Sequence, residues 1–199
     1  MALEIRLLGN LSVQRGGEPV PLPPSRKTRA LLAYLVATGV PHTRTHLCEL
    51  LWDGPDDPRA ALRWSLTKIR PLVDEPGAER LVADHERVSF EPAGATVDVA
   101  ALRAETGSHP AGLAVDALRR AADRFGGELL EELDLPDCYR YHEWWTGERE
   151  SIRARRITVL ATLVERLRAT PADALTYARA ASVWRSRAWR RRRSRLAAP

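Results

Sequence analysis

The chain has 199 residues, of which 44% are hydrophobic and 29% charged, and this composition is typical of a globular protein and excludes a disordered one. The net charge of +5 is uneven: residues 1–92 carry 12 Lys+Arg and 12 Asp+Glu, whereas residues 179–199 carry 8 Arg and no acid. No apolar run approaches the roughly 20 residues of a membrane span, and no signal-peptide core is visible. Two cysteines, Cys48 and Cys138, are too few for a disulfide framework or a zinc site. We therefore expect a cytoplasmic protein.

The N-terminal region predicts strands followed by helices. "LEIRLLG" and "LSVQRGGEPVPL" alternate apolar and polar residues, which predicts three or four short strands across residues 3–22. A first helix is expected to begin after Ser25 as N-cap and to run to Gly39. "TRTHLCELLW" predicts a second helix, with Thr43 or Thr45 as its N-cap.

A third helix is predicted in "DDPRAALRWSLTKIRPLV", residues 56–73. The two acids fit an N-cap and first turn, and Pro58 fits the first helical position. Apolar residues recur at helical spacing and predict a buried stripe of Leu62, Leu66, Ile69 and Val73. No acid occurs between Asp57 and Asp74, so the opposite face carries one sign of charge. Such a face favours a negatively charged partner, although a solvated basic face is the alternative.

The segment after this helix predicts a β-hairpin. "ERLVADHERVSFEP" contains two alternating strands around the turn formed by residues 84–86. Strands, three helices and a hairpin, in this order, are the elements of a winged helix-turn-helix domain. We therefore predict an α+β winged helix-turn-helix domain over residues 1–95.

The remainder is expected to be helical. "HPAGLAVDALRRAADRF" is amphipathic, "ELLEELDLPDC" predicts a short helix and turn, and a long helix follows from "CYRYHEWW" onward. Residues 96–182 are therefore expected to form an all-α, tetratricopeptide-like domain that is incomplete at its C-terminal end. Residues 183–199 form an Arg-rich tail without an apolar stripe, which we expect to be unpacked.

Four segments in order resemble a known family. They are "LEIRLLGNLSV", "PVPLPPSRKTRALLAYLV", "CELLWDGPDDPRAALRWSLTKIRPLV" and "GGELLEELDLPDCYRYHEWWTGERESIRARR". In these segments the chain is similar to the Streptomyces antibiotic regulatory protein (SARP) family, in which an OmpR-type winged helix precedes a bacterial transcriptional activator domain (BTAD). The resemblance covers about residues 3–181. It implies a nucleoid-associated activator of antibiotic and other secondary-metabolite genes that binds direct repeats in double-stranded DNA, as a possible homodimer, and recruits RNA polymerase.

Specific side chains are candidates for contacts with DNA bases. The outward face of the third helix carries Arg63, Trp64, Thr67 and Lys68. Arg63 or Lys68 fits guanine O6 and N7, and Thr67 fits a thymine methyl group. Trp64 has two interpretations, since it could face DNA or pack against the hairpin.

Other side chains are candidates for phosphate contacts, which position a protein on DNA without reading sequence. Arg59 and Arg70 flank the same helix face. Ser25, Arg26 and Lys27 begin the first helix, where amides and cations suit an anion, with simple capping as the alternative. His85 and Arg87 lie in the hairpin and could reach the DNA backbone, although His85 fits an ordinary turn equally well.

No catalytic function, metal or cofactor is predicted. "HEWWT" lacks the second histidine of a zinc-protease helix, and no G-x-x-x-x-G-K phosphate loop occurs. Two alternatives to the activator remain open. One is a protein-interaction scaffold, and the other is a DNA-binding remnant that is unable to activate.

Overall fold

A computed structural model describes residues 2–54, 57–107 and 110–182. The chain divides into two compact units. Among the described residues, 2–102 and 126–150 form the first, here called the sheet unit, and 103–125 and 151–182 form the second, the helical unit. This division differs from the boundary expected near residue 95, because residues 126–150 pack with the N-terminal elements. The Arg-rich tail lies outside the described residues.

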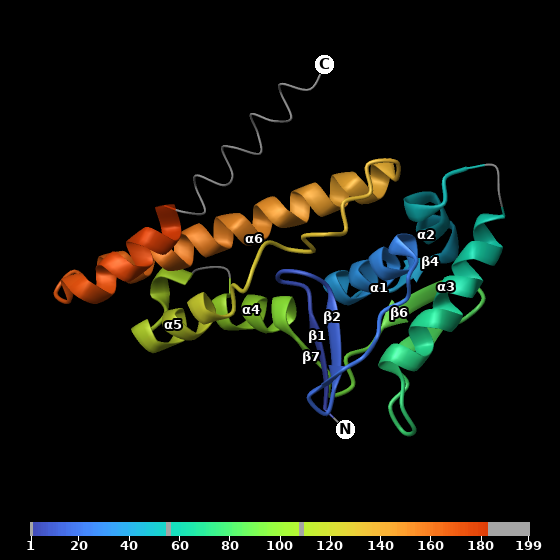
Figure 1. The fold of residues 1–199 in the computed structure, drawn as a ribbon, viewed down its shortest axis with the longest axis horizontal. Helices are drawn as coiled ribbons and strands as arrows, with labels where there is room; N and C mark the ends of the chain where they lie inside the picture. The colour runs from blue at the N-terminus through green and yellow to red at the C-terminus, as the bar shows by residue number, and fades with distance from the viewer. Residues whose placement is uncertain (1, 55–56, 108–109, 183–199) are drawn as a thin grey trace, which may run out of the picture. The chain divides into compact units, whose positions relative to one another are not determined.

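The sheet unit begins with the predicted short strands. They are β1 (Leu3–Arg6), β2 (Ser12–Arg15) and β3 (Glu18–Pro19), joined later by β7 (Thr96–Val97). The strand order is β3-β2-β1-β7, with β1 antiparallel to β2 and parallel to β7 (Figure 1). Leu3 and Ile5 are buried while Arg6 is exposed, so the alternation seen in the sequence does mark one buried face.

Three helices follow, and each begins at a polar N-cap. Their bounds are α1 Arg26–Thr38, α2 Arg44–Leu51 and α3 Pro58–Val73. The cap side chains are Ser25 for α1, Thr43 for α2 and Asp57 for α3, and each accepts a backbone hydrogen bond from the first turn. Gly39 ends α1 with a φ of 62°, a left-handed conformation that glycine adopts without a steric penalty. The predicted helix positions are thus confirmed.

The helices share one core and support a hairpin. The predicted stripe of Leu62, Leu66, Ile69 and Val73 on α3 is buried. Thr28 and Ser65 share a buried hydrogen bond of 2.9 Å, which satisfies two hydroxyl groups between α1 and α3. The predicted hairpin consists of β5 (Leu81–Ala83) and β6 (Arg87–Phe90). A two-residue strand, β4 (His42–Thr43), pairs with β6 and was not predicted.

Residues 126–138 form no helix, so the short helix expected in "ELLEELDLPDC" is wrong. The backbone bonds to the loop after β1 instead: Gly9 N donates to Glu128 O at 2.7 Å, and Leu130 N donates to Leu7 O at 2.8 Å. Glu131 N also donates to Gly9 O at 3.0 Å. The side chains of Leu129, Leu130, Leu133 and Leu135 are buried. Long-range pairing therefore satisfies backbone groups that a local helix would otherwise have satisfied.

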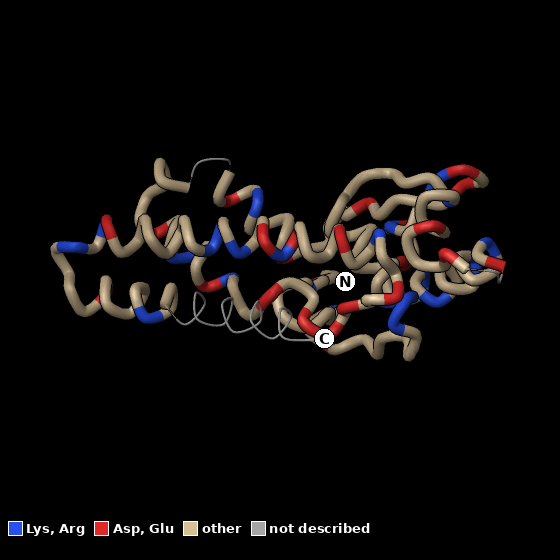
Figure 2. Tube along the Cα trace, turned by 90° about the horizontal axis from the view of Figure 1, so that it is seen from above, with Lys and Arg blue, Asp and Glu red and all other residues tan. Residues whose placement is uncertain are grey.

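The helical unit contains amphipathic helices. Its elements include η1 Pro110–Gly112, α5 Val115–Asp123, the second part of α6 (Tyr139–Arg166), the end of α4 (Asp98–Thr106) and helical residues 171–182. Ile152, Val159 and Leu163 are buried, as their spacing predicted. Lys and Arg positions are interspersed with Asp and Glu positions along the trace (Figure 2). Within the described ranges, no helix is both long and apolar enough to cross a bilayer. The tetratricopeptide-like arrangement stays a prediction.

Candidate nucleic-acid interface

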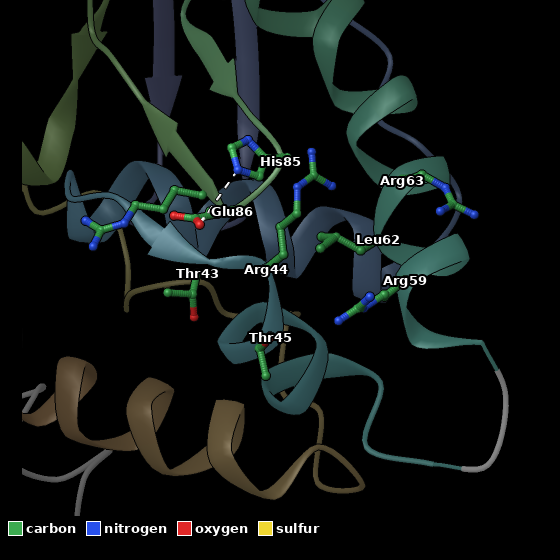
Figure 3. A pocket seen from close by; sticks show the side chains of 9 residues that line it. Thr43, Arg44, Thr45, Arg59, Leu62, Arg63, His85 and Glu86 are labelled. Atoms are coloured by element: carbon green, nitrogen blue, oxygen red, sulfur yellow. Dashed lines mark ion pairs between the residues drawn. The ribbon is translucent and has the colours of Figure 1, made fainter.

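A groove lies where the start of α2, helix α3 and the β5–β6 turn meet (Figure 3). Its volume is about 560 Å³. The lining residues are Thr43, Arg44, Thr45, Arg59, Leu62, Arg63, His85, Glu86 and Arg87. Three separate parts of the sequence therefore contribute to one surface depression, and most of its charged side chains are basic.

A second groove follows the C-terminal half of α3. It is lined by Arg44, Arg63, Leu66, Thr67, Arg70, Pro71, Asp74 and Ala83. Arg44 and Arg63 line both grooves. Among the described residues, the two linings together contain five arginines, namely Arg44, Arg59, Arg63, Arg70 and Arg87. The acids in these linings are Glu86 and Asp74, so the two grooves carry an excess of positive charge.

The outward face of α3 carries the four predicted base-contacting side chains. Arg63, Trp64, Thr67 and Lys68 are all exposed. Trp64 is 49% exposed, and Lys68 Nζ lies 5.5 Å from the centre of its indole ring. This geometry favours the outward interpretation of Trp64 over packing against the hairpin. Thr67 Oγ1 donates to Arg63 O at 3.0 Å, which leaves its methyl group free to meet an apolar ligand atom.

Arg70 is held at the edge of the second groove. Its Nη1 donates to Asp74 Oδ2 at 3.0 Å, one helical turn away. Asp74 Oδ1 accepts from the backbone amides of Arg80 and Leu81, each at 2.8 Å. The Asp74 carboxylate therefore joins the end of α3 to the start of the hairpin, and it neutralises part of the charge of Arg70.

The hairpin turn is closed by one carboxylate. Asp84 Oδ1 accepts from the backbone amides of Glu86 and Arg87, each at 2.7 Å. The amides of Arg87 and then Glu86 lower the pKa of Asp84, because they stabilise its charged form. His85 is 89% exposed, with Nε2 at 3.7 Å from Glu86 Oε1. Arg87 and His85 both line the first groove, and their contact with DNA stays a prediction.

Arg44 is the residue in this surface that sequence reasoning missed. Its backbone amide donates to Glu86 O at 2.8 Å, and its Nε donates to Asp84 O at 2.7 Å. The sequence contained one signal, an arginine immediately after the Thr43 cap. Its proximity to the hairpin depends on the pairing of β4 with β6, and a two-residue strand has too short a pattern to predict.

The structure does not bring Ser25, Arg26 and Lys27 to either groove. Ser25 caps α1, since its Oγ accepts from Thr28 N at 3.3 Å. Arg26 Nη2 donates to two backbone carbonyls, those of Glu132 at 2.9 Å and Asp134 at 2.7 Å. The start of α1 therefore faces residues 132–134 of the same unit, and Arg26 has partners within the chain.

The grooves suit an anionic polymer better than a metal ion. In the part of the chain that the structure describes, no group of three His, Cys, Asp or Glu side chains is placed to hold a metal. Guanidinium groups are donors without an acceptor, and their planar fork matches phosphate oxygens and guanine edges. The arrangement can therefore bind phosphates along the grooves and present the outward face of α3 beside them.

Comparison with known proteins gives a likeness of fold. No protein-family model and no curated protein sequence matches the chain. A solved structure of Mycobacterium tuberculosis EmbR, in complex with a low-affinity phosphopeptide, matches 90% of this chain with a TM-score of 0.61 and 23% sequence identity. This chain spans 58% of the length of that EmbR chain. The mixed N-terminal region of sheet and helices and the helical C-terminal region thus have the fold of EmbR.

Proposed function

We propose that the protein is a sequence-specific DNA-binding transcriptional regulator whose residues 1–95 act as a winged helix-turn-helix, with α3 in the major groove. The observation that carries this proposal is the exposed basic face of α3 beside two arginine-lined grooves, which share Arg44 and Arg63. Helix α3 has 16 residues, which gives a length of about 24 Å at 1.5 Å per residue. An α-helix with its side chains is about 10–12 Å in diameter, which fits a major groove about 12 Å wide.

In this proposal the α3 face reads bases. Arg63 and Lys68 donate to guanine O6 and N7, which is the commonest specific contact of basic side chains with DNA. The methyl group of Thr67 and the exposed ring of Trp64 meet thymine methyl groups. The exposure of these side chains and their place on one helix face support the assignment.

Phosphate contacts come from the arginines around that face. Arg59 and Arg70 belong to α3 and line the first and second groove, and Arg87 of the hairpin lines the first groove as part of the wing. Such contacts set the orientation of α3 on the duplex. The anion site expected at Ser25, Arg26 and Lys27 is left out of the proposal, because Arg26 donates to two carbonyls of its own chain.

The biological role follows from the sequence resemblance. Similarity to the SARP family, together with the fold of EmbR, supports an activator of secondary-metabolite genes that acts at direct repeats and recruits RNA polymerase. Binding as a homodimer would match two repeats in tandem. Residues 96–182 are proposed to supply the activator domain.

Selection of bound sites from a random DNA pool, with the purified full chain, tests the proposal. We expect one enriched motif, and an affinity for it that falls steeply as salt rises from 50 to 200 mM, because phosphate contacts release counterions. A scaffold that binds protein would enrich no motif. A remnant would bind the motif but would not stimulate transcription from a promoter that carries it.

Substitutions on α3 test the base-reading assignment. Arg63→Ala and Lys68→Ala should each weaken binding to the selected site by about 1–3 kcal/mol, with a much smaller effect on random DNA. Arg168→Ala is the matched control, since Arg168 lies in the helical unit with a 75% exposed side chain. Equal effects on both DNAs would instead assign Arg63 and Lys68 to phosphates.

A further inference from the structure

We propose that Arg44 has two functions in DNA binding: it holds the hairpin beside α3, and it contacts a DNA phosphate between them. This inference rests on the proposed function and adds a residue and a role to it. Arg44 belongs to α2, whereas the two structures that it would join are α3 and the β5–β6 turn.

Arg44 attaches the hairpin turn to the start of α2. Arg44 donates from its backbone amide to Glu86 O and from Nε to Asp84 O. Both acceptors are carbonyls of the turn, and the Asp84 side chain closes that same turn from inside. The two bonds of Arg44 therefore attach the turn to the start of α2, next to the pairing of β4 with β6.

The outer end of the Arg44 guanidinium is available to a ligand. Only Nε has an acceptor among the described residues, so Nη1 and Nη2 keep their donors. The side chain lies between His85 on the hairpin and Leu62 on α3 (Figure 3). The bond from Nε already orients the Arg44 side chain. The side chain therefore loses less conformational entropy when a ligand binds its two remaining nitrogens.

The residues around Arg44 carry an excess of positive charge. The first groove is lined by Arg44, Arg59, Arg63 and Arg87 and by the acid Glu86, and the Arg63 guanidinium points away from Arg44 (Figure 3). The carboxylate of Asp84 at the turn adds a second negative charge that interacts with Arg44, so four guanidinium groups stand against two carboxylates. Arginines that surround one solvent-filled groove repel each other, and a phosphodiester placed there relieves that repulsion. The ligand chemistry is therefore a duplex phosphate that bridges Arg44 and the α3 arginines.

Three substitutions separate the two functions of Arg44. Arg44→Ala removes the charge and the bond to Asp84 O. Arg44→Gln removes the charge but keeps an amide donor for that carbonyl. Arg44→Lys keeps the charge, but a single ammonium cannot reproduce the fork that joins the turn and a phosphate. Arg168→Ala again serves as the control.

The experiment measures fluorescence anisotropy of the selected duplex and of a random duplex between 50 and 200 mM salt, with circular dichroism to verify folding. For Arg44→Ala and Arg44→Gln we expect weaker binding to both duplexes. Each phosphate contact adds about 0.9 to the slope of log affinity against log salt concentration. Between 50 and 200 mM salt, one lost contact should therefore reduce the overall loss of affinity by about 3.5-fold. For Arg44→Lys we expect the wild-type salt dependence with weaker binding to the selected duplex.

Two negative results are distinguishable. If the wild-type chain binds no duplex, the proposed function itself fails. If wild type binds but Arg44→Gln retains its affinity and salt dependence, the Arg44 inference alone is overturned. Should Arg44→Ala fail to fold, Arg44→Gln and Arg44→Lys still decide between the outcomes, because both retain a donor for the turn.

Discussion

Substitution of Gly127 by alanine should weaken the attachment of residues 126–138 to the sheet. A Cβ at this position would lie 2.7 Å from Gly9 Cα, 3.1 Å from Gly9 N and 3.0 Å from Glu131 Oε1. The Glu131 carboxylate can rotate away, but Gly9 is backbone and is itself bonded to this segment, through Glu128 O at 2.7 Å. Relief of the clash therefore requires the two backbones to separate.

The magnitude follows from that separation. Insertion of a methyl group into a packed site costs about 1–3 kcal/mol. If the shift also breaks the bond between Gly9 N and Glu128 O, about 1 kcal/mol is added. We expect Gly127→Ala to lower the free energy of unfolding by about 2–4 kcal/mol, a large part of the roughly 5–15 kcal/mol of a typical domain.

Gly126→Ala is the matched control. Its Cβ would lie 3.6 Å from Leu8 O, an ordinary van der Waals distance, so we expect a change within about 1 kcal/mol. The assay is urea unfolding of the full chain, followed by tryptophan fluorescence and circular dichroism. Equal stabilities of the Gly126 and Gly127 variants would show that the close approach to Gly9 is not a constraint, and the reasoning would be refuted.

Three further predictions use the same unfolding assay. Tyr141 is fully buried, and its hydroxyl has no hydrogen-bond partner among the described residues. Tyr141→Phe should therefore leave the free energy of unfolding unchanged or raise it by about 1 kcal/mol. A large decrease would reveal a hidden partner of the hydroxyl. Trp145 is also buried, but its Nε1 donates to Leu130 O at 3.2 Å. Trp145→Phe should therefore lower the free energy of unfolding by about 1–3 kcal/mol. An unchanged free energy of unfolding would contradict that bond. Arg124 donates to Glu105 at 2.8 Å and lowers the pKa of Glu105 below its ordinary 4.5. The pair therefore stabilises the fold above the unfolded-state pKa, and this effect disappears as pH falls through the lower folded-state pKa. Because both side chains are about one-third exposed, Glu105→Gln should cost only about 0.5–1 kcal/mol at pH 7, and this difference from wild type should vanish in acid; a difference independent of pH would assign the destabilisation to packing.

Local chemistry in the sequence determined helices α1, α2 and α3 and the hairpin. Ser25 and Asp57 cap helices because a short polar side chain satisfies amides that the first turn leaves free. Leu62 and Ile69 are buried, and Arg63 and Lys68 exposed, because the 3.6-residue period places them on opposite faces of one helix. The candidate base-contacting side chains were thus identifiable from spacing alone.

The tertiary structure alone decided which distant segments meet. Strand β4 has two residues, too few for an alternating pattern, and its pairing with β6 is what brings Arg44 to the hairpin. The acidic, leucine-rich sequence around residues 128–135 predicts a helix, yet its amides and carbonyls bond to Leu7 and Gly9, about 120 residues earlier in the chain. The same packing places the carbonyl of Asp134 beside Arg26. Local propensity differs by only about tenths of a kcal/mol per residue, so burial of several leucines and satisfied long-range hydrogen bonds outweigh it.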